Sequence, residues 1–350
     1  MTDEVHSLCQ TSEDQSGRGR VNEVVVVNPL IRKRGRCESR MDIAAWCENE
    51  YSPVFRHFSH GKGIYVMDEQ WDNLVILDAC RYDTFKETNT IAGMVSSRIS
   101  RGSDTAEFLL ENFTKYPKRT TFTEIVYIAG NAWVSSLLSN RFHKIYSVWD
   151  YGWDDQLGTV PPQRVVEQAL DAHAKYGDKK LIVHFMQPHF PALTGPLAKL
   201  ENTVSFARET ARKGLNPIKE SAEGKHAVQL SDLLKQGKLG REDVISAYKE
   251  NLTIVLSSVE KLVNELSGRI VITADHGETF GERPGLSYPF RVFGHPRCMH
   301  VKPLVVVPWL AIEGGDQRTA NRGKEDIERK VYSDEEDAKI KDRLRKLGYD

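Results

Sequence analysis

The chain has 350 residues, of which 40% are hydrophobic and 28% charged, and its formal net charge is -1. These values suit one large or two smaller globular domains, and the near-zero charge excludes a bulk attraction to nucleic acid or to an anionic membrane. No apolar run approaches the roughly 18 residues that span a bilayer, so no membrane span is expected. The five cysteines are scattered without a C-x-x-C pair, which predicts reduced thiols and a cytoplasmic location.

The two ends of the chain differ in composition from its middle. Residues 1–40 are polar and charged, which predicts a flexible leader, although a basic cluster within them also suits contact with an acidic ligand or partner. That cluster comprises Arg32, Lys33, Arg34 and Arg36. Residues 41–58 favour a helix that packs on the core, and a catalytic domain is expected over 41–315. A charged linker and a C-terminal helix are expected over 316–350.

A first buried strand is predicted for the apolar run 74–77, and it ends on a carboxylate, Asp78. Residues 81–87 should open a helix. Its first residue, Arg81, can grip the oxygens of an anionic substrate or form an ordinary surface salt bridge.

The next predicted pair is a strand over 95–99 and a helix over 106–113. Ser103 and Thr105 therefore lie at a helix N-terminus, where hydroxyl side chains are favoured caps. The free N–H groups and the dipole of such a helix can also stabilise an anion. Arg101, just before them, has the same two possible roles as Arg81.

Strands and helices then alternate through the middle of the chain. Strands are predicted over 122–129, 144–148 and 181–186, and helices over 132–138 and 164–175. This alternation predicts an α/β fold with a mainly parallel sheet flanked by helices. The strands expected at its centre begin at Leu74, Ile125, Leu181 and Ile270.

His189 follows the strand over 181–186 in the segment PHFP, which makes it a candidate site residue. Residues 193–240 show weak periodicity and are expected to form a helical insertion or lid. Residues 241–266 carry apolar side chains at i, i+3 and i+4 spacing, which predicts a long amphipathic helix.

The run 270–273 predicts another buried strand, followed by Asp275, His276 and Gly277. An Asp oxygen and a His nitrogen at a strand's carboxyl end suit a divalent metal, and sites in open α/β sheets gather at those ends. Gly277 would let the backbone turn away beneath them. The loop 279–293 should bring His295 and His300 back toward the site, before a further strand over 302–308.

Three segments resemble the alkaline phosphatase and sulfatase superfamily: LVILDACRYD, IVITADHGE, and FGHP before VKPLVVVPW. The ending DEEDAKIKDRLRKLGYD resembles the terminal helix of many sulfatase-like proteins, and the whole is most similar to prokaryotic, archaeal-type sulfatase-like hydrolases. The resemblance runs in patches from Trp71 to the C-terminus. It implies an alkaline-phosphatase-like three-layer sandwich around a mainly parallel central sheet.

The resemblance also implies a metal site. One cation would be held by Asp78, Asp275, His276 and the Thr105 hydroxyl. A second would need His295, with His189 or His300, and one more carboxylate. The candidates for that carboxylate are Asp83, Asp150, Asp154 and Asp155. One or two ions therefore stay open; zinc is the expected metal, with Mn, Mg or Ca as alternatives.

The implied reaction is the hydrolysis of an anionic ester, with Thr105 or Ser103 as nucleophile and His189 or His300 as general acid. The formylglycine motif of sulfatases, Cys or Ser-x-Pro-x-Arg, is absent around Thr105, so phosphate esters are favoured over sulfate esters. Two alternatives remain: a phosphoryl-group transferase acting on a glycan or lipid head group, and an inactive binding protein of the same fold. The sequence leaves the substrate, a small molecule or a glycan ester, and the oligomeric state open.

Overall fold

A computed structural model describes residues 62–199, 203–214, 230–283 and 291–313. The predicted leader, the predicted helix over 41–58 and the predicted C-terminal helix lie outside the described residues. All described residues belong to one compact unit, Met41–Asp350. Within the part of the chain that is described, no helix is long and apolar enough to cross a membrane.

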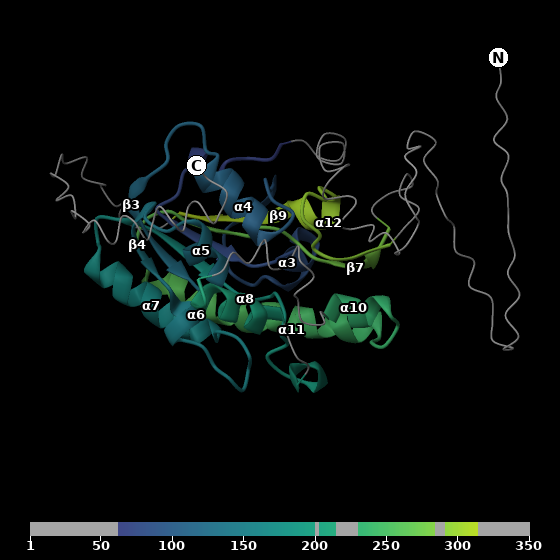
Figure 1. Cartoon of the computed structure of the whole chain (residues 1–350). Coiled ribbons are helices and arrows are strands. Elements are labelled where there is room, and N and C mark those ends of the chain that lie inside the picture. Colours follow the sequence, from purple (N-terminus) through teal and green to yellow (C-terminus); the bar gives the residue numbers. More distant parts are fainter. Residues whose placement is uncertain (1–61, 200–202, 215–229, 284–290, 314–350) are drawn as a thin grey trace, which may run out of the picture. The chain divides into compact units, whose positions relative to one another are not determined.

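A seven-stranded sheet forms the centre of the fold (Figure 1). Its strands are β1 (Asn73–Leu77), β2 (Met94–Ile99), β3 (Phe122–Ala129), β4 (Phe142–Tyr146), β5 (Lys180–Phe185), β6 (Ile270–Thr273) and β9 (Val306–Ile312). They lie in the order β2-β9-β6-β1-β5-β3-β4. The neighbours β6, β1, β5, β3 and β4 pair in parallel, and β9 pairs antiparallel with both β6 and β2. The prediction of a mainly parallel sheet is confirmed, and its four expected central strands are contiguous.

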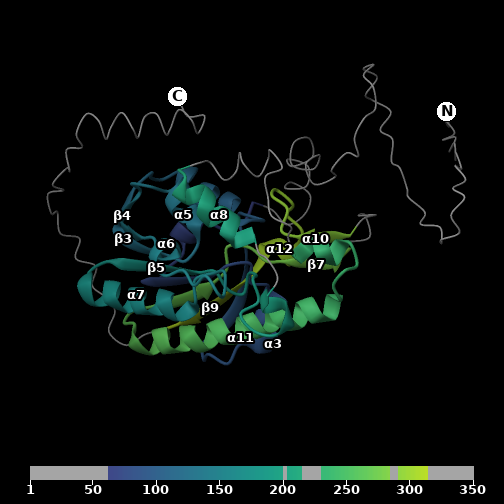
Figure 2. The ribbon, with the colours of Figure 1, turned by 60° about the horizontal axis from the view of Figure 1, so that its bottom comes forward.

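The apolar runs explain why these strands are central. Every residue of β1 and β6 is buried, as are the last five of β3, so these strands are covered on both faces. The helices α3 (Tyr82–Thr88), α7 (Pro162–Lys175) and α11 (Arg241–Glu265) pack together on one face. Figure 2 shows α7 and α11 on one side of the sheet and α5 (Ala132–Leu137) and α8 (Thr203–Arg212) on the other. The sheet and the helices on its two faces form three layers, as the sequence predicts.

The long helix α11 shows why its sequence predicted a core-facing stripe. Its buried apolar residues recur at helical spacing and are Val244, Tyr248, Leu252, Val255, Leu256, Val259 and Leu262. Two polar residues of the helix, Asn251 and Ser258, are also buried. This stripe packs α11 against the sheet and places its N-terminal half beside the ends of β1 and β5.

The structure corrects several predicted boundaries. The predicted strand over 302–308 begins instead as a short helix, α12 (Lys302–Val305), before β9, because Pro303 occupies the first helical turn, where its fixed φ is favourable. The predicted loop 279–293 contains a hairpin of β7 (Thr279–Glu282) and β8 (Val292–Gly294). The helix predicted over 106–113 is α4 (Thr105–Leu109), continued by a π-helical turn, Leu110–Thr114.

The predicted insertion over 193–240 is helical where it is described. It contains a 3₁₀ turn (Pro196–Lys199), α8 and α10 (Leu230–Lys235). Helix α8 packs against α5 and α6 (Val148–Tyr151), whereas α10 packs on the β7–β8 hairpin. Helix α10 and Leu197 of the 3₁₀ turn pack in one apolar cluster with Phe190 and Phe280, next to the site residues His189 and Glu278.

Gly277 is required by close packing, and its φ is not in the left-handed region. A Cβ atom on Gly277 would lie 2.0 Å from the carbonyl oxygen of Pro303, and the Gly277 N–H donates to the Leu304 carbonyl at 2.7 Å. The segment after β6 thus touches the start of α12 backbone to backbone.

Gly277→Ala should therefore lower the free energy of unfolding by about 1–3 kcal/mol, because the backbone must move to admit the methyl group. Gly177→Ala is the control, since its Cβ would meet no atom within 4 Å. Urea denaturation of both variants in the presence of a chelator is the measurement. Equal stability of the two variants would contradict the close approach at Gly277.

Candidate active site

The carboxyl ends of three neighbouring parallel strands bring titratable side chains to one edge of the sheet. Asp78 follows β1, Asp275 follows β6, and His184 is the second-last residue of β5. All three are at most 1% exposed. One ligand atom from each lies within 4.8 Å of the others, which makes the three a possible metal-binding group. The predicted proximity of Asp78 and Asp275 is thus present in the structure.

Thr105 and His276 face the same point. The Thr105 Oγ1 atom lies 2.8 Å from Oδ2 of Asp275 and 3.3 Å from Nε2 of His276. That Nε2 lies 3.5 Å from Oδ1 of Asp78. Thr105 is the first residue of α4, and the preceding Asp104 caps this helix by accepting from the Glu107 N–H at 2.7 Å. The four side chains predicted to share one cation are therefore brought together.

Hydrogen bonds hold Asp275, Asp78 and His276 through the atoms that face away from the point they share. Asp275 Oδ1 accepts from the backbone N–H groups of Ala79 and His276, at 3.1 and 2.9 Å. Asp78 Oδ2 accepts from Nδ2 of Asn131 at 2.6 Å. His276 Nδ1 donates to the Gly277 carbonyl at 2.7 Å, and because a carbonyl can only accept, the neutral ring presents its lone pair at Nε2. Such outer contacts are typical of metal-ligand side chains.

Ala79 shows that local strain accompanies this arrangement. Its φ is 59°, a left-handed value that is uncommon for a residue with a Cβ atom. The conformation is held from both sides, because the Ala79 N–H donates to Asp275 and its carbonyl accepts from the Tyr248 hydroxyl at 2.6 Å. Strain of this kind persists where surrounding contacts over-determine it, and it is common at functional sites.

Burial and like charge make the two carboxylates an unfavourable pair by themselves. Burial, with the neighbouring Asp275, raises the pKa of Asp78 well above its usual value. Burial alone would also raise the pKa of Asp275, but His276, His184 and the Thr105 hydroxyl outweigh it and hold that pKa below its usual range. Oδ1 of Asp78 and Nε2 of His184 are buried without a hydrogen-bond partner. Both atoms can offer a lone pair to a metal, and both lie beside the Asp275 carboxylate, so together they fit a cation.

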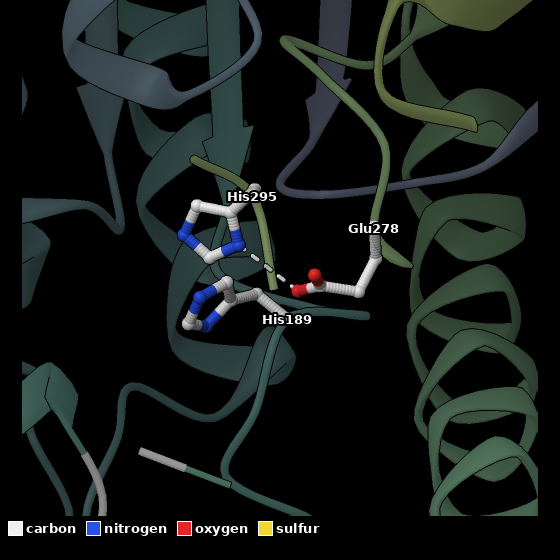
Figure 3. A group of neighbouring side chains, drawn as sticks. All are labelled: His189, Glu278 and His295. Carbon is white, nitrogen blue, oxygen red and sulfur yellow. Dashed lines mark hydrogen bonds and ion pairs between the residues drawn. The ribbon is translucent and has the colours of Figure 1, made fainter. Parts of the chain in front are cut away.

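A second group, of His189, Glu278 and His295, adjoins the first (Figure 3). The three residues offer ligand atoms that lie within 4.8 Å of one another, and His295 Nδ1 is 3.0 Å from Oε2 of Glu278. The His276 and His295 rings are 4.7 Å apart between centroids, which joins the two groups. Thr279 pairs with Gly294 in the β7–β8 hairpin, so Glu278 and His295 are the next residues along it.

Glu278 is the carboxylate that the sequence prediction missed. It follows Asp275 by three residues in the same DHGE segment, so this adjacency was the available signal. The four carboxylates predicted for this role are engaged elsewhere. Asp83 pairs with Arg81 at 2.6 Å, Asp150 with Arg212 at 2.7 Å and Asp155 with Arg208 at 3.4 Å, while Asp154 accepts from the backbone N–H groups of Gln156 and Leu157.

The two histidines of the second group differ in charge. Burial and the neighbouring His295 lower the pKa of His189 to about 4, so its ring is neutral near pH 7. Burial opposes protonation of His295, but the Glu278 carboxylate outweighs it and raises the pKa of His295 to about 9. His295 in turn holds the pKa of Glu278 below its usual value in spite of burial. One side of the group is therefore an ion pair, and the other a neutral imidazole.

Ser103 and His300 do not join either group. His300 is 1% exposed, and its Nε2 lies 3.1 Å from Oε1 of Glu107. Ser103 Oγ lies 3.0 Å from the other oxygen of Glu107 and accepts from the Met299 N–H at 3.1 Å. Glu107 thus ties the start of α4 to the 296–300 segment. Both side chains therefore have a structural contact with Glu107 in the described structure, and the general-acid role of His300 and the substrate contact of Ser103 stay predictions.

Arg81 and Arg101 are likewise bound to protein groups. Besides its pair with Asp83, Arg81 donates to the Glu278 carbonyl at 3.1 Å and pairs with Glu282 at 2.5 Å. Arg101 pairs with Glu111 at 3.2 Å and lies 3.9 Å from the ring centre of Tyr65. Of the two roles considered for each arginine, the structure shows the salt bridge. Arg81 also supports the backbone of Glu278.

Comparison with known proteins gives a limited result. No protein-family model and no curated protein matches the chain. Similar solved structures include the integral membrane phosphoethanolamine transferase EptA from Neisseria meningitidis, with a TM-score of 0.45 and 14% identity over 69% of this chain and 47% of that one. They also include the zinc complex of the periplasmic domain of EcEptC from Escherichia coli, with a TM-score of 0.38 and 14% identity over 71% and 74%. A third is a protein in the alkaline phosphatase superfamily from Vibrio parahaemolyticus, with a TM-score of 0.39 and 12% identity over 80% and 71%.

The resemblance to the alkaline phosphatase superfamily stays a prediction from the sequence motifs, because these matches share 14% identity or less and have TM-scores below 0.5. The archaeal-type subgroup is not tested by them and stays a prediction. The chain spans about half the length of the EptA structure. At this identity and TM-score, the roles of individual residues rest on the geometry of this chain alone.

The ion pair of His295 and Glu278 predicts a pH dependence of the metal-free chain. The pKa of His295 is raised from 6.5 to about 9, so its stabilisation is complete below about pH 6.5 and is lost as the pH rises toward 9. The free energy of unfolding of the chelator-treated protein should therefore fall across this window. His295→Gln should show a smaller fall in the same titration. Parallel pH profiles of the two proteins would mean that the pair does not form.

Proposed function

We propose that this chain is a metal-dependent hydrolase of phosphate esters that uses Thr105 as its nucleophile. The observation that carries the proposal is the position of Thr105 Oγ1, 2.8 Å from Oδ2 of Asp275 and 3.3 Å from Nε2 of His276, which in turn lies 3.5 Å from Oδ1 of Asp78. A buried hydroxyl beside a carboxylate and an imidazole, at the carboxyl edge of a parallel sheet, supports a role as an activated nucleophile.

Asp78, Asp275, His276 and Thr105 would hold the first divalent cation. The unpartnered Oδ1 of Asp78 supports this assignment, because a buried carboxylate oxygen without a donor is costly. When bound, such a cation lowers the pKa of a coordinated hydroxyl and offsets the charge of the phosphate. The mixed nitrogen and oxygen donors favour zinc, with manganese, magnesium and calcium as alternatives.

The residues of the chain then have separate roles in the transfer. The Thr105 oxygen forms a bond to phosphorus while the bond to the leaving alcohol breaks, and the hydroxyl proton is lost to water. The hydrogen bond from the hydroxyl to Oδ2 of Asp275 orients the attacking oxygen. The resulting phosphothreonine is then hydrolysed by water, which releases phosphate and restores the hydroxyl.

The second group, of His189, Glu278 and His295, acts on the leaving alcohol, and its chemistry allows two roles. His295, kept protonated by Glu278, can donate a proton to the leaving oxygen. Alternatively, Glu278, His189 and His295 can together hold a second cation, for which the neutral His189 is suited because its Nδ1 donates to the Phe190 carbonyl and leaves Nε2 free. The metal content of the protein decides between these uses.

Glu278 weakens the alternative of an inactive binding protein, since that alternative drew support from the missing second carboxylate. A phosphoryl-group transferase is the remaining alternative, because an alcohol on a glycan or lipid head group could accept the phosphoryl group in place of water. Product analysis with an added alcohol acceptor separates the two: free phosphate alone indicates a hydrolase, and a new phosphate ester indicates a transferase.

Thr105→Ala should lower the turnover of an aryl phosphate by at least about 10²-fold, because the attacking oxygen is removed. Ser103→Ala is the matched control: its hydroxyl faces Glu107, so activity should change far less. Rapid quenching with radiolabelled substrate should trap label on Thr105 in the parent protein. Full activity of Thr105→Ala would overturn the assignment of the nucleophile.

Asp275→Asn should lose the first cation and the activity together, because it removes a charged ligand from the centre of the first group. Glu278→Gln tests the second group. Elemental analysis should show one ion fewer per chain in this variant if two are bound, and unchanged content if His295 acts as the acid. Retention of the parent metal content by Asp275→Asn would show that the cation lies elsewhere.

A further inference from the structure

His184 is a buried histidine within a central strand that the reaction described above leaves unused. It is 0% exposed, and its neighbours along β5 are the apolar residues Val183 and Phe185. Its Nε2 has no hydrogen-bond partner. An imidazole in such a place is costly unless both ring nitrogens are satisfied, so its presence calls for a partner at Nε2.

The back of the ring is fixed by Tyr127 on the adjacent strand. The Tyr127 hydroxyl lies 2.9 Å from Nδ1 of His184, and both side chains are fully buried. Strands β3 and β5 pair in register here, with Ala129 opposite His184. With Nδ1 anchored, Nε2 points toward the carboxylates of Asp78 and Asp275, with which it shares a space no wider than 4.8 Å.

The distances distinguish two possible partners for Nε2 of His184: the Asp275 carboxylate through a hydrogen bond, or a cation. It lies 3.7 Å from Oδ2 of Asp275, which is too long for a hydrogen bond to that oxygen. A separation of this size is close to that of His276 Nε2 from the same oxygen, 3.6 Å, and His276 is one of the proposed ligands. His184 and His276 therefore stand in the same relation to Asp275, as two nitrogen ligands of one cation would.

We propose that Nε2 of His184 is a fifth donor to the cation that the proposed function places among Asp78, Thr105, Asp275 and His276. This inference rests on the proposed function. It assigns the proton of His184 to Nδ1, which donates to the Tyr127 oxygen, and one cation then satisfies both unpartnered atoms, Asp78 Oδ1 and His184 Nε2.

A site with two imidazoles, two carboxylates and a hydroxyl has a definite metal preference. Imidazole nitrogen favours Zn²⁺, Co²⁺ and related ions, whereas Mg²⁺ and Ca²⁺ prefer oxygen donors alone. His184 therefore makes the site selective against Mg²⁺ and Ca²⁺. His184→Asp, which replaces nitrogen with oxygen, should narrow the ratio of Zn²⁺ to Mg²⁺ affinity.

The test uses the full chain loaded with Co²⁺, whose visible absorption reports the ligand set. His184→Gln should weaken Co²⁺ binding at least about tenfold and change the absorption band, as should His276→Gln, while the exposed His143→Gln should do neither. Tyr127→Phe should weaken binding by about 10–100-fold, because it removes the acceptor of the Nδ1 proton and leaves the ligands in place.

A second measurement holds even if His184→Gln fails to fold. In the parent chain labelled with ¹⁵N-histidine and loaded with ¹¹³Cd²⁺, a one-bond coupling to cadmium should appear on the ring whose Nδ1 signal shifts in Tyr127→Phe. Absence of that coupling would overturn the inference. So would a parent-like Co²⁺ affinity and spectrum in His184→Gln, and in both cases the proposed function would stand. A parent chain that binds neither Co²⁺ nor Cd²⁺ would overturn both.

Discussion

Two carboxylates, Asp78 and Asp275, lie side by side in a dry part of the protein, and the rest of the site is arranged around this unfavourable contact. Neither side chain is more than 1% exposed. Ionised carboxylates repel each other strongly where water is excluded, so the pair needs compensating charge or donors. Hydrogen bonds supply part of that compensation. Backbone N–H groups bind Oδ1 of Asp275, Asn131 binds Oδ2 of Asp78, and the Thr105 hydroxyl binds Oδ2 of Asp275. What remains uncompensated faces one point, which is why a cation there is the economical explanation of the geometry.

The sequence predicted the parts of this arrangement that depend on local pattern. Buried apolar runs located the four central strands, and the rule that parallel strands end at one edge brought Asp78 to Asp275. Glu278 and His184 were not assigned because their roles depend on pairing. Glu278 is placed by the register of the β7–β8 hairpin, and His184 by its position beside β1. These strand pairings cannot be read from one amino-acid sequence, because they depend on contacts between distant segments.

Four residues that the sequence offered for catalysis or substrate binding share one feature in the structure. Ser103, His300, Arg81 and Arg101 each have a chemically suitable side chain near a site motif, yet each is bound to a protein carboxylate. Residue type and proximity in sequence cannot show whether a polar group is already paired. Buried polar atoms without a hydrogen-bond partner include Nε of Arg101 and Nδ1 of His300 as well as atoms of Asp78 and His184. What sets Asp78 and His184 apart is that each also offers a ligand atom to one group with Asp275.

The spacing between the two halves of the site is set by one face of α11. Tyr248 and Asn251 are three residues apart, so both point to the same side of this helix. The Tyr248 hydroxyl bonds to the Ala79 carbonyl and to the Arg81 N–H, which fixes the chain after Asp78. Asn251 donates to the Pro191 carbonyl at 2.9 Å and accepts from the Leu193 N–H at 2.9 Å, which holds the segment that follows His189.

The backbone completes this connection, because the His189 N–H donates to the Asp78 carbonyl at 3.1 Å. Asp78 and His189 belong to the two different candidate metal-binding groups, so this bond and the α11 face together fix the separation of the groups. The apolar stripe of α11 holds the helix on the sheet, and two polar residues within that stripe position the site. Core packing and site geometry are therefore carried by the same helix face, which explains why two hydrogen-bonding side chains are kept in its buried side despite the cost of burying them.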